Sequence, residues 1–383
     1  MDKNRIMPLF PLVKGKTSKQ AHAKFPIING KITYEHEHGR QGFFGKASHL
    51  YHKNPPTNFT KIEGPFKPEM LNTNNLPVPD KEDPNAMPVT IMENNDLKIK
   101  VSMMSKPMPF YYKNTEGDDV WFVHRGAGKF ESVYGSFTFK KGDYIVIPRG
   151  TIYRFVPETT DNSFFIVESA EEMQVPDRGL LGPNALYDTA MIETPEPGVI
   201  EDGKEWVIRF KRFNQYTDYT FPNNPCDVVG WTGNVTPWKL SIEDFRPINS
   251  HRYHLPPSVH TTFLSQGFVI CSFVPRPYET AEDALKIPFY HSNVEYDEVI
   301  FYHAGDFMSR DDVKPGMISF HPMGFTHGPH PKALKRMFKQ DKPLTQEYAV
   351  MIDTRNPLMI TEAGYKICNP EYQNSWKGAK FEE

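Results

Sequence analysis

Short runs of alternating or β-branched apolar residues make up much of the chain beyond its first 87 positions. Between Pro88 and Ser169, and again from about Thr261, these runs are bounded by Gly, Pro, Asn or Asp. Such spacing is typical of the short strands of a sandwich or barrel. Only Lys332–Phe338 and Ala281–Leu285 look helical, and both stretches are short. The pattern therefore predicts an all-β fold with few short helices.

An internal repeat accounts for this recurrence of strands. Tyr112–Gly126 aligns with His291–Gly305 at a constant shift of 179 residues, and Gly142–Tyr153 aligns with Gly316–His327 at a shift of 174. Two segments that repeat in the same order indicate a duplicated unit. We predict an N-terminal arm with short strands, a first barrel, a connector with additional strands, and a second barrel, over residues 1–87, 88–170, 171–250 and 251–383.

Composition and charge narrow the class of protein. The chain has 383 residues, a hydrophobic fraction of 38% and a net charge of −3, and its Lys and Arg residues do not gather into blocks. We therefore expect no nucleic-acid partner and no membrane partner. The N-terminal sequence lacks a signal-peptide core, and no run of about 18 apolar residues occurs, which favours a cytoplasmic protein. Three scattered cysteines, Cys226, Cys271 and Cys368, predict neither a disulfide framework nor a thiolate zinc site.

Three residues of the second half are spaced as metal ligands are. His291 is followed seven residues later by Glu298, and a G-x5-P-x-G-x2-H run ends at His327. This pattern resembles the two signature motifs of the cupin superfamily, in which neighbouring strands of a small β-barrel or jelly roll bring the ligands together in the barrel mouth. The resemblance implies a duplicated cupin, or bicupin. Two imidazoles and one carboxylate leave coordination positions open and suit Fe(II), but Mn, Zn and Ni accept the same donors.

The first copy of the repeat acts as an internal control for this metal site. Its residues at the three ligand positions are Tyr112, Asp119 and Tyr153. Tyrosine is a poor replacement for imidazole in a ferrous site, whose preferred ligands are His and carboxylate. We therefore expect the first barrel to hold no metal, and the chain to hold a single iron.

Beyond the barrel motifs, the chain resembles the homogentisate 1,2-dioxygenase family over most of its length. The passages that carry the resemblance are GFFGKASHLYHKNPPT, HLPPSVHTTF, HSNVEYDEVIFYHAGDFMSR and HPMGFTHGPHPKA. The resemblance implies a mononuclear Fe(II) enzyme of tyrosine and phenylalanine catabolism, which opens the ring of homogentisate with both atoms of O2 to give maleylacetoacetate. It also implies that His291, Glu298 and His327 are the iron ligands, and that His254 in HLPPS is the acid/base histidine.

Other positions of the family pattern imply contacts with the substrate or support for the ligands. His321 matches a second active-site histidine, and His330 lies close behind the metal motif. Ser292 stands where the family often has a basic residue, and Phe307 stands near a position that is often tyrosine. Both departures fall where a substrate carboxylate or hydroxyl would be held, so the identity of the aromatic acid stays open.

Two further points rest on local spacing. Better-known relatives have the Glu ligand six residues after the first His, where this chain has Asp297, so Asp297 is the alternative to Glu298. His36 and His38 form a His-x-His in YEHEHG, but they stand in a polar arm without an obvious partner, and we expect both to be solvated.

Three functions stay open on this reading. The leading one is homogentisate ring cleavage; the second is cleavage of another hydroquinone acid such as gentisate; the third is a non-catalytic bicupin that binds a metal or small ligand. The expected partners are a small aromatic acid, O2 and further copies of the chain, since the resemblance implies trimers or hexamers.

Overall fold

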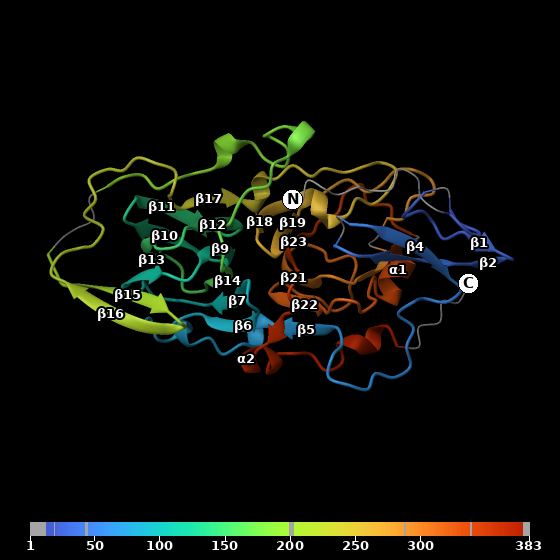
Figure 1. Cartoon of the computed structure of the whole chain (residues 1–383), viewed down its shortest axis with the longest axis horizontal. Helices are drawn as coiled ribbons and strands as arrows, with labels where there is room; N and C mark the ends of the chain where they lie inside the picture. The colour runs from blue at the N-terminus through green and yellow to red at the C-terminus, as the bar shows by residue number, and fades with distance from the viewer. Residues whose placement is uncertain are drawn as a thin grey trace.

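The computed structural model describes residues 13–18, 20–42, 45–198, 203–286, 289–337 and 339–377. Two sheets form the first half of the molecule, at the left of Figure 1. The outer sheet has the strand order β11 (Gly135–Lys140), β10 (Ala127–Ser132), β13 (Ile152–Pro157), β8 (Tyr111–Asn114), β15 (Trp206–Arg212), β16 (Gln215–Phe221). The inner sheet has the order β17 (Trp238–Ser241), β12 (Asp143–Ile147), β9 (Asp118–Arg125), β14 (Ser163–Ser169), β7 (Leu97–Ser102), β6 (Val89–Glu93), β24 (Met359–Ile360).

The second half is also built from two sheets, with a small extra ribbon at its end. Its inner sheet has the order β18 (Thr261–Ser265), β19 (Phe268–Phe273), β23 (Tyr348–Thr354), β21 (Asp297–Ala304), β22 (Met317–His321), β5 (Glu69–Asn72). Its outer sheet has the order β20 (Tyr290–Asn293), β3 (Tyr34–Gly39), β4 (Ala47–His52). The ribbon pairs β1 (Ile27–Ile28) with β2 (Lys31–Ile32).

The sequence repeat is a structural repeat. β8 and β20, β9 and β21, and β12 and β22 begin at equivalent positions of the two aligned segments. The glycines that the repeat shares also adopt matching left-handed conformations, with φ of 97° at Gly126 and 95° at Gly305. An added Cβ at Gly305 would lie 1.5 Å from the carbonyl oxygen of Gln346, so this turn requires glycine. The prediction of a duplicated all-β chain is confirmed.

The two halves exchange the strands that precede them. The hairpin β3–β4 comes before the first half, yet β3 pairs in parallel with β20 of the second half. The hairpin β15–β16 comes before the second half, yet β15 pairs in parallel with β8 of the first half. β5 and β17 follow the same rule, since they pair with β22 and β12. The N-terminal arm therefore completes the second barrel, and the connector completes the first.

The inner sheets of the two halves pack face to face in the middle of the molecule. One continuous apolar cluster takes residues from both, including Phe122, Phe165, Phe301 and Val350. The rings of Phe165 and Phe301 are stacked with centroids 4.5 Å apart. Burial of large apolar side chains against one another is the main stabilising contribution to such a contact.

Helices are few, as predicted, but not all lie where the sequence indicated. α1 (Pro331–Met337) matches one predicted stretch, of which Phe338 lies outside the described residues. The other prediction, for Ala281–Leu285, is wrong: this stretch forms a turn and one isolated β-bridge, Ala23 with Ala284. A short helix α2 (Glu362–Tyr365) was not predicted. The described single-turn 3-10 helices are Thr73–Asn75, Pro79–Lys81, Gly179–Leu181, Thr189–Met191, Ile242–Asp244, Pro257–His260 and Tyr372–Ser375.

Candidate metal centre

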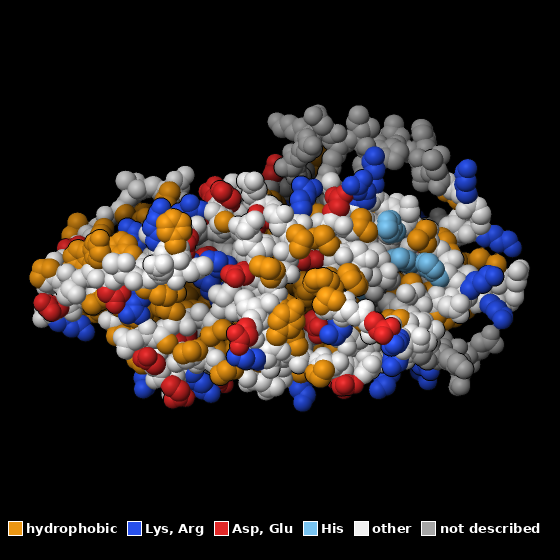
Figure 2. Space-filling view, turned by 60° about the horizontal axis from the view of Figure 1, so that its bottom comes forward, with side chains coloured by type: hydrophobic (Ala, Val, Ile, Leu, Met, Phe, Trp, Pro, Cys, Tyr) orange, Lys and Arg blue, Asp and Glu red, His pale blue; other side chains and the backbone are white. Residues whose placement is uncertain are grey.

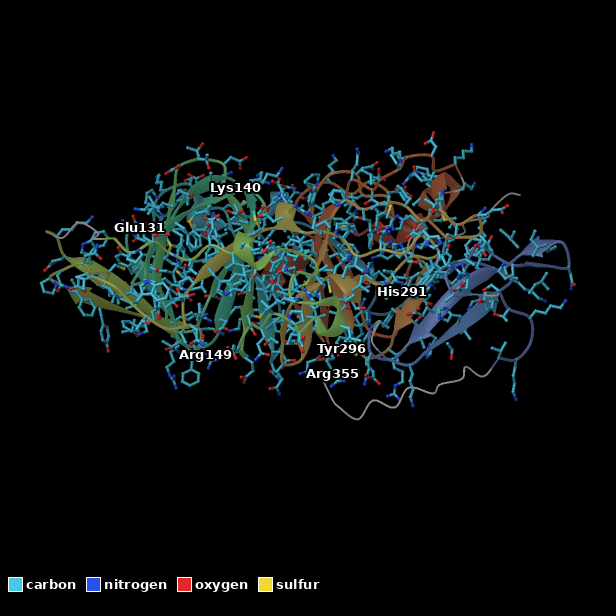
Figure 3. All side chains as sticks on the ribbon, turned by 90° about the horizontal axis from the view of Figure 1, so that it is seen from above. Glu131, Lys140, Arg149, His291, Tyr296 and Arg355 are labelled. Carbon is cyan, nitrogen blue, oxygen red and sulfur yellow. The ribbon has the colours of Figure 1, made fainter. Side chains whose placement is uncertain are left out.

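Three neighbouring segments of the second barrel bring His291, Glu298 and His327 together. His291 lies on β20, Glu298 on β21, and His327 on the loop that follows β22. One ligand atom from each residue lies within 4.8 Å of the others, and all three side chains are buried. His291 Nε2 is 3.4 Å from Glu298 Oε2, and His327 Nε2 is 3.4 Å from Glu298 Oε1. In Figure 3 His291 lies where the blue N-terminal strands meet the second half.

The backbone fixes the two histidines relative to each other. The His291 amide donates to the His327 carbonyl at 2.9 Å, and the His327 amide donates to the His291 carbonyl at 3.0 Å. The intervening turn is held by Gly324, whose amide donates to the Asn293 carbonyl and whose φ is 79°. The P-x-G-x2-H spacing thus returns the chain to β20 with both imidazoles on the same side.

Hydrogen bonds also determine which ring nitrogen faces the centre. Nδ1 of His291 lies 3.0 Å from the carbonyl oxygen of Phe289, and Nδ1 of His327 lies 3.0 Å from that of Phe325. A carbonyl can only accept, so both Nδ1 atoms carry the proton and both Nε2 atoms present a lone pair. The buried Nε2 of His327 has no hydrogen-bond partner in the described chain. A buried acceptor without a donor is what a metal ligand requires, so this donor set fits a divalent cation.

Glu298 supplies the negative charge of the centre. Burial opposes its ionisation, but attraction to His327 when that ring is protonated, and hydrogen bonds such as the one from His321 Nδ1, hold the pKa of Glu298 well below its usual range. The carboxylate is therefore ionised at neutral pH, as a metal ligand must be.

His321 orients that carboxylate from behind. Its Nδ1 donates to Glu298 Oε1 at 2.8 Å, and its Nε2 accepts from the Tyr372 hydroxyl at 3.1 Å. The His321 ring also stacks on the His327 ring at 4.1 Å. Burial, followed by the charge of His327, holds the pKa of His321 well below its usual range, so the ring stays neutral and its two nitrogens keep these roles.

Asp297, the alternative ligand to Glu298, accepts hydrogen bonds from two loops instead of facing the histidines. Its Oδ1 accepts from the Met323 amide and its Oδ2 accepts from the Leu358 amide, each at 2.6 Å. Successive side chains of a strand point to opposite faces. Because Glu298 faces the histidines, its neighbour Asp297 faces away and ties two loops to the strand.

The first barrel has a different arrangement at the equivalent positions. The Tyr153 hydroxyl lies 3.3 Å from Asp119 Oδ2, and the rings of Tyr112 and Tyr153 meet edge to face. Burial and then the charge of Glu168 raise the pKa of Asp119 to about 7. Among residues 88–170, all of them described, no His, Cys, Asp and Glu side chains form a group with metal-ligand spacing.

His254 lies beside the centre but does not touch the three candidate ligands in any contact of the described residues. The ring of Phe289 is close to both histidines, 6.3 Å from His254 and 5.6 Å from His291. Arg276 donates to Nδ1 of His254 at 2.5 Å. Burial and the charge of Arg276 lower the pKa of His254 to about 4, so the ring is neutral at pH 7. With Nδ1 accepting, the proton of the neutral ring lies on Nε2.

The remaining predicted positions do not face the metal centre directly. Ser292 follows His291 on β20 and bonds on the other face to His36 and Thr326, each at 2.8 Å. Phe307 packs in an aromatic cluster against Tyr302. His330 is buried, accepts from the Asp311 amide and lies 3.3 Å from the Ser375 hydroxyl.

One expectation about the arm is wrong. His38 is exposed as predicted, but His36 is buried, with Nε2 2.8 Å from Ser292 Oγ and Nδ1 3.1 Å from His52 Nε2. The reason is the exchange of hairpins, which turns β3 from a solvated arm into the neighbour of β20. Glu37 also pairs in register with His291 and was missed, although the alternation of Glu and His in YEHEHG is the signal of a strand with two polar faces.

All three cysteines lie among the described residues. Cys226, Cys271 and Cys368 form no disulfide. Among the described residues, no helix has the length and apolar character needed to span a bilayer.

The fold and the centre together define a two-barrel β protein in which one barrel carries a two-histidine, one-carboxylate group. A model of the N-terminal region of homogentisate 1,2-dioxygenase matches residues 85–242, and a model of its C-terminal region matches residues 243–383. The chain therefore belongs to the homogentisate 1,2-dioxygenase family.

Individual relatives vary in similarity. A Saccharolobus solfataricus protein named as a dioxygenase without a stated substrate is 31% identical, over 95% of this chain and 98% of its own length. The homogentisate 1,2-dioxygenases of Nitrobacter hamburgensis and Bradyrhizobium diazoefficiens are 28% and 26% identical over 70% of this chain. The matched region spans 63% of the length of each of these two enzymes.

Solved structures give weaker matches. The YlbA protein of E. coli and a cupin 2 conserved barrel protein of Leptotrichia buccalis both have a TM-score of 0.34 and 10% identity. The first match covers 75% of this chain and 90% of the other, and the second covers 78% and 99%.

Proposed function

We propose that this chain is an Fe(II)-dependent dioxygenase that opens the ring of homogentisate with O2 to give maleylacetoacetate, within tyrosine and phenylalanine breakdown. The observation that carries the proposal is the convergence of two Nε2 lone pairs and one ionised carboxylate, from His291, His327 and Glu298. Family membership supports the reaction class, and the donor set supports iron. Two imidazoles and one carboxylate are the ligands of non-haem ferrous oxygenases.

Fe(II) bound to these three residues would offer open positions at which a phenolic oxygen of the substrate and O2 can be held together. The protein's own contribution is to fix the ligands. The backbone bonds between His291 and His327 set the distance between the imidazoles, and His321 sets the orientation of Glu298. Ligands fixed before the substrate arrives reduce the cost of assembling the reacting groups in one geometry.

His254 is the proposed acid/base residue, and its surroundings define how it acts. Because Arg276 donates to Nδ1, the neutral ring presents an Nε2–H group. Such a group donates a hydrogen bond to a substrate oxygen and stabilises negative charge on it. Taking up a proton from the substrate at Nδ1 would require Arg276 to move away first.

The substrate, the compartment and the assembly belong to the same proposal. Ser292 and Phe307 are uncharged, so neither supplies a cation for a substrate carboxylate, and gentisate stays an outcome of the test. Three cysteines without a disulfide support a reducing cytoplasm. The resemblance to the family supports trimers or hexamers, and β4, the end strand of its sheet, leaves one edge unpaired within the described chain.

Anaerobic reconstitution with Fe(II), followed by an oxygen-electrode assay, tests this function. Homogentisate should consume O2 and produce maleylacetoacetate absorbance, and the variant His327→Ala should do neither. Consumption of gentisate without consumption of homogentisate would overturn the substrate assignment. Iron retention without O2 consumption on either acid would support a non-catalytic bicupin instead.

A further inference from the structure

A second group of histidines and carboxylates lies on the N-terminal hairpin. His22, Glu37 and His49 each offer one ligand atom within 4.8 Å of the others. His22 Nε2 is 3.4 Å from Glu37 Oε2, and His49 Nε2 is 3.8 Å from the same oxygen. Two ligand atoms about 2.1 Å from one cation are about 3.4 Å apart when they subtend a tetrahedral angle. These separations are close to those of His291, Glu298 and His327.

Glu35 contacts the two histidines of this group at the ring nitrogens that do not face Glu37. Its Oε1 lies 2.7 Å from Nδ1 of His49 and 3.4 Å from Nδ1 of His22, and its oxygens also accept from the His22 amide. Metal-ligating histidines usually direct their other ring nitrogen to a carboxylate, carbonyl or water. Here the Glu35 carboxylate contacts Nδ1 of both rings, and the Nε2 atoms of both rings face Glu37.

The burial of this group bears on how its charge is balanced. His22 is only 5% exposed, and its Nδ1 lies 3.4 Å from Glu35 Oε1 without the geometry of a hydrogen bond. Glu35 and Glu37 are also buried, and no described Lys or Arg pairs with either of them. Two buried carboxylates without a fixed cation are costly unless something neutralises them.

The other hairpin of the repeat serves as a control. In β3–β4, Glu37 lies opposite His49 and beside His291; in β15–β16, Arg209 lies opposite Asp218 and beside Tyr112. Arg209 and Asp218 form a two-pronged ion pair at 2.8 Å, which is neutral by itself. In the hairpin next to the first barrel, the charge of Asp218 is thus balanced by Arg209. In the hairpin next to His291, by contrast, no described Lys or Arg forms an ion pair with Glu37.

We propose that His22, Glu37 and His49 bind a second divalent transition-metal cation of the Zn2+ type. The donor set of two imidazoles and a carboxylate is one that Zn2+ accepts, with Glu35 orienting the imidazoles. The cation ties the segment around His22 to both strands of the hairpin. It lies next to the iron centre, because Glu37 is in register with His291 and the ring of His22 stacks on Phe289 at 3.7 Å. Figure 2 shows histidine side chains gathered on the surface at this end of the molecule.

Metal counting on the full chain tests the proposal. The protein is stripped with a chelator, loaded with Zn2+, freed of excess metal by gel filtration and assayed by mass spectrometry of the metal. The wild type should hold two equivalents of zinc, since Zn2+ also accepts the ligands of the iron centre. His49→Ala and His327→Ala should each hold one, and the double variant none. The exposed neighbour His38→Ala is the matched control and should hold two.

The outcomes separate this proposal from the proposed function. If the wild type holds one equivalent and His49→Ala still holds one, the second site does not exist, and the group is an ion-pair network around a protonated His22. If His49→Ala loses zinc while His327→Ala keeps all of its zinc, the second site exists, and His291, Glu298 and His327 do not bind a metal. Glu37→Gln keeps the shape of the side chain and replaces His49→Ala if the latter does not fold, as judged by its circular dichroism.

Discussion

His124 and His303 occupy equivalent positions of the two halves and meet each other, with their Nδ1 atoms 3.0 Å apart. They lie on β9 and β21, the strands that face each other across the contact between the inner sheets. One Nδ1 must donate and the other accept, so the pair is asymmetric although the positions are equivalent. Two histidines at equivalent positions of the repeat thus form a polar contact inside the apolar cluster between the barrels.

This pair makes the stability of the molecule depend on pH. Burial, together with the charge of His303, lowers the pKa of His124 to about 2, and burial lowers that of His303 to about 3. Both pKa values are below that of the unfolded chain, so the folded state binds fewer protons than the unfolded state below pH 6.5. The free energy of unfolding should therefore fall by about 2–4 kcal/mol between pH 7 and pH 5 through these two groups.

Urea denaturation at the two pH values measures this effect. The double variant His124→Gln with His303→Gln retains polar groups but cannot titrate, so its loss of stability over the same range should be smaller than that of the wild type. An equal loss in both proteins would show that the pair does not contribute.

Neighbouring acids on β21 should behave in opposite ways. Glu298→Gln removes the charged ligand and should abolish iron retention and O2 uptake, with the fold intact. Asp297→Asn should retain iron but unfold more easily, by about 1–3 kcal/mol, because the amide group cannot accept from both Met323 and Leu358. Iron content and urea denaturation of both variants check this prediction. Iron loss in Asp297→Asn alone would reverse the ligand assignment.

His321 should control how tightly the metal is held. His321→Ala removes the donor that orients Glu298, and loss of such a group weakens metal binding by about 10–100-fold. Tyr372→Phe removes only the bond to the far side of the His321 ring and should have a smaller effect. Competition with a chelator measures both affinities. If the two variants lose affinity equally, or if neither does, His321 does not act through Glu298.

Arg276 should set the protonation of His254. Burial and then Arg276 lower the pKa of His254, while Glu279 raises it. Arg276→Met should therefore move this pKa up from about 4, so that His254 becomes protonated on mild acidification and activity falls at a higher pH than in the wild type. His254→Gln should reduce kcat by about 100-fold and remove this pH dependence. If activity falls at the same acid pH in the wild type and in Arg276→Met, Arg276 does not set the protonation of His254.

The repeat could be predicted from the sequence because the signals that define each of its strands lie within one short segment. Glycines at left-handed turns and alternating apolar residues fix β9, β12, β21 and β22, and each can be recognised within one short segment. The convergence of His291, Glu298 and His327 could be predicted for the same reason, since the turn at Gly324 returns the chain to β20 within a few tens of residues.

The exchange of hairpins could not be predicted in this way. β3 pairs with β20 across more than 250 residues of chain, and no local pattern says which of two similar barrels an arm will join. The burial of His36 and the place of Glu37 beside His291 follow from that pairing alone. The same holds for Tyr372, which reaches His321 from the C-terminal end.

Ring cleavage with labelled oxygen tests the central claim most directly. The chain reconstituted with Fe(II) is given homogentisate under 18O2, and the product is analysed by mass spectrometry. We expect maleylacetoacetate that carries both labelled atoms, and no product from His327→Ala. Unchanged homogentisate, or a product without both labels, would contradict the account.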